Sequence, residues 1–346
     1  MAKSTIVPAA WLAIMIWALV STRNDNIFDQ QPQVSGTAYS WAFLSSMTSV
    51  IGNYATLSVN QSDFSRYSRV SVKWQCIYVP MLPIFFTFIA FIGIASASAG
   101  GALYGVIEWD PIALISHWSN RPAKFFAALS FALAALGVNI SANSLSAAND
   151  LMALFPSYVN IRRGQVLCAI LCWALVPWKI LESAGSFLNF MSAYAIFLGP
   201  IAAIMLFDFY VVHKRRYDTV SMYNPKGIYR YTGGVNWRAI VAFLVGVAPS
   251  MPGFINGINP DVDVGVGIHP YQFGWLLGFF GTALVYTALS LLLPARETFI
   301  DRAVRPDEVY AAQGYAEGVP PDSGSGDVEQ GVPEKKTMRD RFERFL

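Results

Sequence analysis

The chain has 346 residues, of which 54% are hydrophobic and only 13% are charged, and its mean hydropathy is +0.42. Soluble domains carry about 25% charged residues, and a net charge of +2 offers no basic footprint for nucleic acid. The composition also excludes a disordered chain and a disulfide scaffold. It predicts an all-α polytopic membrane protein.

Eight stretches are long and apolar enough to cross a bilayer, which needs about 20 such residues. They are residues 5–22, 38–60, 76–99, 122–148, 165–181, 184–210, 238–255 and 273–294. The first is interpreted as a span and not as a signal peptide, because no A-x-A cleavage pattern follows it. A further short helix is predicted at residues 109–115, on the outer surface.

The distribution of basic residues predicts the orientation of these spans. With the N-terminus in the cytoplasm, the inner segments hold twelve Lys and Arg residues and the outer loops hold four, as the positive-inside rule requires. Residues 1–295 are predicted to form a transmembrane domain with a basic, Tyr-rich cytoplasmic loop at 211–237. Residues 296–346 are predicted to form a cytoplasmic, largely disordered tail.

A polar stripe runs along the predicted span at 38–60. At 100° per residue, four polar side chains fall within about 60° of Asn53. These are Ser46, Ser49, Thr56 and Asn60. Gly52 lowers the resistance of the helix to unwinding at this point, so a broken helix that presents free backbone groups beside Asn53 is predicted.

A second polar stripe lies in the span at 122–148. Asn139 and Asn143 are one helical turn apart, and Ser146 and Asp150 follow on the same face. Each amide both donates and accepts hydrogen bonds, which suits a planar ligand edge with alternating C=O and N–H groups. Polar residues in membrane helices also join helices by hydrogen bonds without any ligand. Two stripes together favour a binding cavity over that alternative.

Catalytic and metal-binding patterns are missing from the sequence. Cys168 and Cys172 are one turn apart, but no further Cys or His completes a metal set. No phosphate-binding loop, nucleophile elbow or zinc-protease motif occurs. We therefore expect no enzyme, no metal and no cofactor.

Five short motifs lie within or beside the predicted spans. They are Asn60-Gln61-Ser62-Asp63-Phe64-Ser65-Arg66-Tyr67, Asn139-Ile140-Ser141-Ala142-Asn143, Phe187-Leu188-Asn189-Phe190, Asp208-Phe209-Tyr210 and Gly234-Val235-Asn236-Trp237. Together they resemble the nucleobase–cation symporter-1 family, in particular its fungal uracil, uridine and allantoin permeases, over about residues 5–295. The resemblance implies secondary transport by alternating access in the inverted-repeat fold of the leucine transporter.

The resemblance also implies a substrate site. Asn53 and Tyr54 would contact the ligand at the break of their helix, and Asn143 would hydrogen-bond the heterocycle with support from Asn139. Phe190 would line or gate the pocket. Sodium-coupled members carry hydroxyl residues where this chain has Gly137 and Val138, so the resemblance favours a co-transported proton over sodium.

The family has twelve helices, and this chain begins at what resembles the fifth. We therefore expect a truncated sequence and a partial fold that lacks the first four helices. The function expected is import of uracil-, uridine- or allantoin-like compounds across the plasma membrane, with both termini cytoplasmic and lipid as the surroundings. The alternative is a non-transporting membrane fragment that pairs with an intact transporter.

Overall fold

The structure is a computed structural model that describes residues 2–23, 27, 34–65, 68, 70–179, 184–224, 226–305 and 308. Within these residues the chain is helical, and strand pairing is limited to two isolated bridges, Asp218 with Val304 and Thr232 with Val235. The predicted all-α class is therefore confirmed. Most of the predicted tail, residues 306, 307 and 309–346, lies outside the described residues, so the predicted domain division stays a prediction.

The helices follow one another along the chain, and the described connection before α10 is long, from His213 to Asn236. The α-helices are α1 (Ala2–Ser21), α2 (Gly36–Ser65), α3 (Val72–Gln75), α4 (Tyr78–Tyr104), α5 (Pro111–Ser116), α6 (Arg121–Val138), α7 (Ser144–Leu154), α8 (Ile161–Ala174), α9 (Ala184–Phe207), α10 (Trp237–Val247), α11 (Met251–Ile258), α12 (His269–Gln272) and α13 (Gly274–Leu292). Two π-helical segments, η1 (Asn139–Asn143) and η3 (Asp208–Val212), continue α6 and α9.

Each predicted span overlaps a helix, although α8 ends at Ala174, well before the end of the span predicted at 165–181, of which residues 180 and 181 lie outside the described residues. Not every span meets a strict criterion of length and apolarity. Five helical segments meet it: Lys73–Tyr104, Arg121–Leu154, Phe187–Val212, Trp237–Ile258 and Gly274–Leu292. Thr5–Ser21 is apolar but shorter. Helix α8 has only 14 residues, and α2, with 30, is long enough but too polar.

Side-chain caps set the starts of several helices. Helix α6 begins after Asn120, whose Oδ1 accepts a hydrogen bond from the Ala123 N–H at 3.1 Å. Helix α5, the predicted short helix, begins after Asp110, whose Oδ1 accepts from the Ile112 N–H at 2.9 Å. Both helices carry proline in the first turn, where its missing N–H costs nothing.

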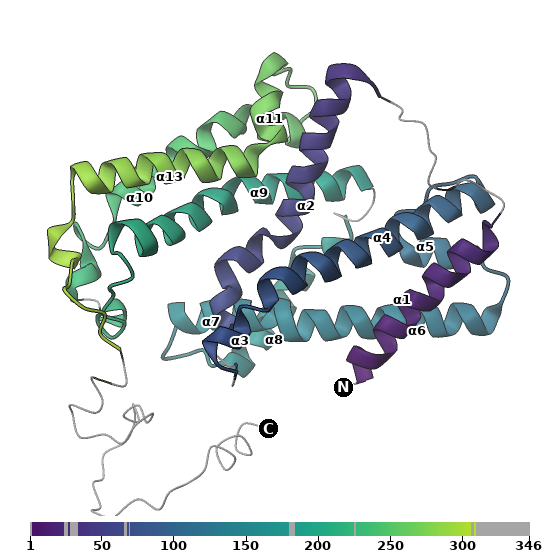
Figure 1. Cartoon of the computed structure of the whole chain (residues 1–346), viewed down its shortest axis with the longest axis horizontal. Helices are drawn as coiled ribbons and strands as arrows, with labels where there is room; N and C mark the ends of the chain where they lie inside the picture. The colour runs from purple at the N-terminus through teal and green to yellow at the C-terminus, as the bar shows by residue number, and fades with distance from the viewer. Residues whose placement is uncertain are drawn as a thin grey trace, which may run out of the picture. The chain divides into compact units, whose positions relative to one another are not determined.

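Helix α9 is the centre of the best-packed part of the chain. It packs against α2, α10 and α13, and Figure 1 shows α9 and α13 running side by side. A small residue allows this close approach: a Cβ on Gly199 of α9 would lie 2.6 Å from the Trp275 carbonyl oxygen of α13. Small-residue contacts of this kind drive helix association where lipid removes the hydrophobic incentive.

The predicted break in the second span is wrong, because α2 is helical throughout Gly36–Ser65. Gly52 serves close packing instead. A Cβ at this position would lie 2.3 Å from the carbonyl oxygen of Met191 in α9, so the absence of a side chain allows the two backbones to touch. The glycine that suggested unwinding in fact marks a helix–helix contact.

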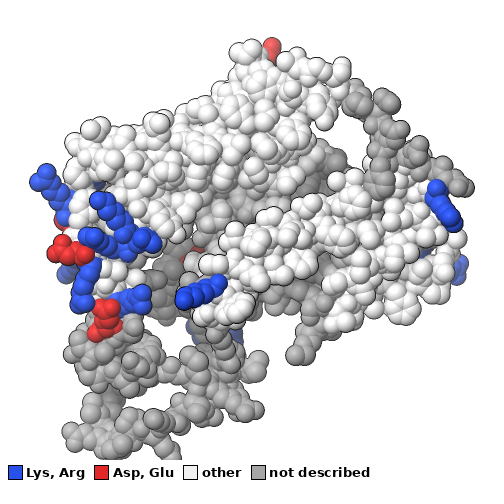
Figure 2. All heavy atoms as spheres, in the orientation of Figure 1, with Lys and Arg blue, Asp and Glu red and all other residues white. Residues whose placement is uncertain are grey.

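The chain divides into two compact units. The first comprises residues 1–212 and 237–294 and holds all the long helices. The second comprises residues 213–236 and 295–346, of which the described part packs around the buried His213. Figure 2 shows that the charged side chains on the visible face gather at helix ends and loops, while the flanks of the helices carry few.

Candidate substrate-binding site

The π-helical segment η1 carries the two asparagines of the second polar stripe. Asn143 Nδ2 donates to Asn139 Oδ1 at 2.7 Å, and Asn139 Nδ2 donates to the Ala135 carbonyl at 3.0 Å. The predicted proximity of the two amides is confirmed, although the local helix is π and not α. Single π turns in α-helices occur frequently at functional sites.

Both amides of this pair, the amide face, are exposed. They lie in the middle of the 34-residue apolar segment Arg121–Leu154. An unsatisfied polar group at membrane depth costs several kcal/mol in contact with hydrocarbon, so the amide face requires a polar partner or water in the functional state. The Asn143 Oδ1 atom and one N–H of each amide remain for such a partner.

The polar stripe of α2 has a different use at its centre. Ser49 is buried, and its Oγ lies 2.7 Å from Ser192 Oγ of α9. Thr48, also buried, donates to the Gln272 carbonyl at 2.8 Å. These hydroxyls, with Gly52, form the α2–α9 seam and its continuation to α12. Of these residues only Ser49 belongs to the predicted stripe, and for Ser49 the interhelical alternative is the correct one.

The remaining predicted ligand residues lie on α2 and α9. Asn53 is exposed, whereas Tyr54 is partly buried and its ring packs 4.3 Å from that of Phe86 in α4. Phe190 is 46% exposed and stacks on Tyr194 at 6.3 Å. Among the described residues, no hydrogen bond or ring contact joins these three side chains to the amide face.

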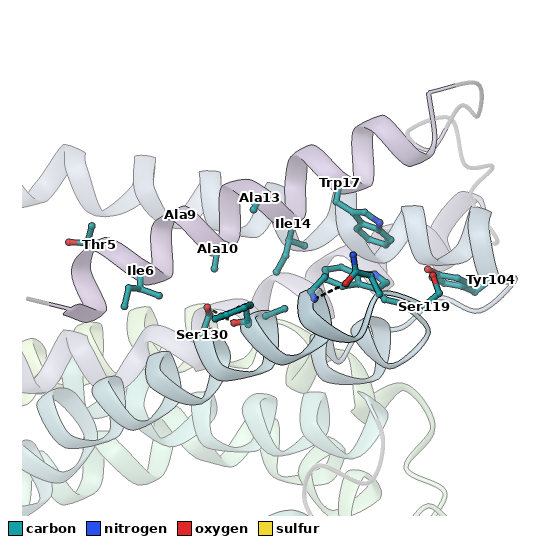
Figure 3. Close-up of a pocket in the computed structure, with 15 residues that line it drawn as sticks. Thr5, Ile6, Ala9, Ala10, Ala13, Ile14, Trp17, Tyr104, Ser119 and Ser130 are labelled. Carbon is teal, nitrogen blue, oxygen red and sulfur yellow. Dashed lines mark hydrogen bonds between the residues drawn. The ribbon is translucent and has the colours of Figure 1, made fainter.

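A cavity of about 830 Å³ lies elsewhere, between α1 and α6. Figure 3 shows Ala9, Ala10 and Ala13 of α1 along it, with Thr5 at one end and Tyr104 at the other. None of the five predicted ligand residues lines this cavity. Its lining is mainly apolar, so it offers few groups to recognise a polar heterocycle.

Two contacts between distant residues of the first unit, one hydrogen bond and one ring stack, were not predicted. The hydroxyl of Tyr286, which is 1% exposed, donates to Asp208 at the start of η3. The sequence signal for this contact was the carboxylate of Asp208 at the end of an apolar span, because charged residues there are rare and usually have a polar partner. The ring of His269 in α12 stacks on that of Trp41 in α2, with 3.9 Å between the ring centroids. These residues are too far apart in sequence for any local pattern to reveal the contact.

Tyr271 closes the α12 end of the seam. Its hydroxyl donates to the Asn189 carbonyl of α9 at 3.3 Å, and burial raises the pKa of Tyr271 to about 12. No group of three or more His, Cys, Asp or Glu side chains suited to a metal occurs in the part of the chain that the structure describes.

Comparison with known proteins places the chain in a family. Residues 1–278 match the model of permeases for cytosine/purines, uracil, thiamine and allantoin. A permease of Schizosaccharomyces pombe described as uncharacterized is 39% identical over 330 residues, which cover 94% of this chain and 58% of that protein. The uracil permease of Saccharomyces cerevisiae is 35% identical and the allantoin permease 34%, over 84% and 86% of this chain.

Two solved structures have the same fold. An inward-facing conformation of Mhp1 superposes with a TM-score of 0.63 at 21% identity, over 88% of this chain and 65% of that one. Mhp1, a nucleobase-cation-symport-1 family transporter, in a closed conformation with bromovinylhydantoin bound gives 0.62 at 22%, over 86% and 63%.

The matches leave part of each relative uncovered. The chain spans 48% of the uracil permease, 49% of the allantoin permease and 58% of the Schizosaccharomyces pombe protein, about half the length of these curated relatives. The match itself extends over most of the chain, and the helices it covers are those of an integral membrane protein. The chain belongs to the family of permeases for cytosine/purines, uracil, thiamine and allantoin.

Proposed function

We propose that the chain acts in secondary active transport, importing uracil-, uridine- or allantoin-like compounds by alternating access. Import would be across the plasma membrane with both termini in the cytoplasm, and a proton would accompany the substrate. The single observation that carries the proposal is the exposed amide face of Asn139 and Asn143, at mid-span in a π turn.

The hydrogen bonds already made by the amide face determine what it recognises. Asn143 donates one N–H to Asn139, so its Oδ1 and its second N–H are available. An acceptor and a donor side by side complement a ligand edge that presents N–H beside C=O. Between Lys124 and Leu154 the only charged residue is Asp150, so an uncharged ligand is favoured over an anionic one.

The similar proteins support the same chemical class. The matched permeases of Saccharomyces cerevisiae are named for uracil, uridine and allantoin, and Mhp1 is described with bromovinylhydantoin bound. Each of these ligands presents an edge with N–H beside C=O. We propose that Asn143 binds this edge, that Asn139 orients Asn143, and that Asn53, Tyr54 and Phe190 complete the contact when the helices rearrange.

Proton coupling is proposed from the same helix. Gly137 and Val138, which directly precede Asn139 in the sequence, have no side-chain oxygen to offer a cation. Sodium prefers oxygen ligands, as other hard cations do. A proton is therefore the proposed co-transported ion, and uptake should rise in acidic medium and collapse with a protonophore.

Uptake by cells that lack their own uracil, uridine and allantoin systems tests the proposal. We expect the chain to confer uptake of at least one labelled compound, and the Asn143→Ala variant to lose at least tenfold of it, about the loss of one good hydrogen bond to a buried ligand. Ser141→Ala is the matched control, because Ser141 is exposed in the same π turn and donates to the Gly137 carbonyl.

Binding by the purified chain separates recognition from transport. Ligand-dependent thermal stabilisation that Asn143→Ala abolishes and Ser141→Ala preserves would support the site even without uptake. The proposal is refuted if the protein is well folded and present at the cell surface but shows no uptake of any of the three compounds and no stabilisation by any of them.

A further inference from the structure

The turn that follows the span Phe187–Val212 has a backbone that its residues do not favour. The Arg216 N–H donates to the His213 carbonyl at 2.9 Å, which closes a four-residue turn. Its two central residues, Lys214 and Arg215, have φ values of +52° and +65°. Such a turn is built from Asn or Asp and Gly in most proteins, whereas a side chain with φ above zero stores strain.

The two flanks of the turn explain how the strain is maintained. His213 is only 5% exposed, and its Nε2 lies 2.9 Å from Thr298 Oγ1. Because Thr298 Oγ1 already donates to the Ala295 carbonyl, Nε2 carries the proton and donates to it. Nδ1 then accepts from the Tyr217 hydroxyl at 3.0 Å. Bonds on both sides of residues 214–216 thus impose the tight turn.

The turn exposes three consecutive cations, and we name Lys214, Arg215 and Arg216 the basic turn. The described part of this unit holds four acidic side chains, Asp218, Glu297, Asp301 and Glu308, and two of them are engaged by other groups. Asp218 accepts from Val220 N, Ser221 N and Ser221 Oγ, and Glu308 pairs with Arg302 at 3.6 Å. No ion pair to the basic turn occurs in the part of the chain described.

The position of the basic turn in the chain determines what it meets. His213 directly follows the last residue of an apolar span, so the next three residues emerge at headgroup level. The unit has eight Lys and Arg residues against four Asp and Glu in its described part. Basic clusters directly next to a span on the cytoplasmic side attract anionic lipid headgroups.

We propose that the basic turn is a binding site for the phosphate of anionic phospholipid headgroups in the cytoplasmic leaflet. The strained backbone directs three cations outward from one short segment, and guanidinium groups bind phosphate oxygens through paired N–H donors. Residues with the right backbone preference, such as Asn-Gly, would fold more easily but would lack the charge. Binding of this kind does not require transport, but its assignment to the cytoplasmic leaflet rests on the orientation given under the proposed function.

The test is a titration of the purified chain in neutral detergent with short-chain phosphatidylserine. Short-chain phosphatidylcholine is the uncharged comparison, and inorganic phosphate tests for a free anion. We expect saturable binding of phosphatidylserine that weakens with salt, with much weaker binding of the other two. Equal affinity for phosphatidylserine and phosphatidylcholine would overturn the proposal, and so would equal affinity for inorganic phosphate.

Variants locate the site. Lys214→Asn combined with Arg215→Gly keeps a turn of this type while removing two charges, and should weaken phosphatidylserine binding about 30-fold, from about fivefold for each basic residue. Its thermal midpoint without lipid should equal or exceed that of the wild type, because the strain is relieved. Arg302→Gln, which removes a paired cation of the same unit, should leave the affinity unchanged.

A second double variant controls for the possibility that the first one is misfolded. If the first variant unfolds at a lower temperature than the wild type, Lys214→Gln combined with Arg215→Gln, which keeps side chains of similar length, decides the result. Loss of binding with an unchanged midpoint supports the site. Retained binding by either well-folded variant would overturn it.

Discussion

The α2–α9 seam and the amide face arise from the same kind of sequence pattern and have opposite environments. In the seam, the hydroxyl of Ser49 is buried and lies 2.7 Å from that of Ser192. On the amide face, Asn139 and Asn143 bond to each other and to one backbone carbonyl, yet both remain exposed. Polar spacing in an apolar helix therefore identifies a face but does not say whether that face holds helices together or meets a ligand.

The difference follows from what each helix packs against. Gly52 brings α2 into backbone contact with α9, and the short side chain of Ser49 hydrogen-bonds across that narrow gap to Ser192. The amides are longer and lie in a segment that is mostly exposed. Close approach favours interhelical hydrogen bonds, whereas an open face leaves donors and acceptors for a ligand.

The largest expected effect concerns the seam itself. Gly52→Ala would place a Cβ 2.3 Å from the Met191 carbonyl oxygen, so α2 and α9 would have to separate, at a cost of about 1–3 kcal/mol or more. Thermal unfolding in detergent should show a clear drop in midpoint. The control is Gly93→Ala in α4, where a Cβ meets nothing within 4 Å and helix propensity predicts a small gain. Equal midpoints for both variants would show that the seam is not tight.

A smaller effect is expected from the supporting amide. Asn139→Ala removes the group that receives the Asn143 N–H, so Asn143 loses its orientation while its own atoms remain. Ligand affinity should fall about tenfold, or roughly 1.4 kcal/mol, with little change in the thermal midpoint because Asn139 is exposed. Equilibrium binding and unfolding on the same preparation check both parts. A large drop in midpoint at unchanged affinity would make Asn139 a structural residue.

The bond across the seam should be measurable but modest. In a double-mutant cycle of Ser49→Ala and Ser192→Ala, the coupling energy should be about 0.6 kcal/mol, the average for hydrogen bonds between membrane helices. Unfolding of the two single variants and the double variant provides the cycle. Ligand affinity should change little in all three variants. Strict additivity in stability would mean that the two hydroxyls do not interact.

The smallest effect lies outside the membrane region. The hydrogen bond from Ser221, then those from the Ser221 and Val220 N–H groups, lower the pKa of Asp218 below its ordinary value of 3.8. The charged form is therefore favoured in the folded state, and its contribution to stability is present above pH 3.8 and is lost as the pH falls through the lower, folded-state value.

Hydrogen exchange of residues 217–224 across this acid range measures the Asp218 effect. Protection should decline at low pH in the wild type, and Asp218→Asn should show a weaker dependence on pH. A decline of the same size in both proteins would assign the effect to other groups.

Much of the fold is predictable from sequence because apolar length and loop charge are local properties. The spans at 76–99 and 273–294 correspond to α4 and α13, and the caps at Asp110 and Asn120 are visible as sequence signals. The role of Gly52 is not predictable, because a glycine that permits unwinding and one that permits contact look alike until the partner helix is known. The pairing of Asn139 with Asn143 is predictable from their spacing, but the π turn that carries it is not.

Contacts between distant segments account for the rest. The Asp208–Tyr286 hydrogen bond joins residues 78 positions apart, and the Trp41–His269 stack joins α2 to α12. No periodicity within one helix encodes such partners. Similarly, the strained turn at Lys214 and Arg215 is the opposite of what turn preferences predict, because His213 and its partners impose it from outside.

The most direct test of the central claim measures binding of uracil and of an N-methylated uracil to the wild type and to Asn143→Ala. If Asn143 reads an edge with N–H beside C=O, the wild type should prefer uracil about tenfold or more, and the variant should bind both compounds equally and weakly. A preference for uracil that survives in well-folded Asn143→Ala would contradict the account, because some other group would then recognise that edge.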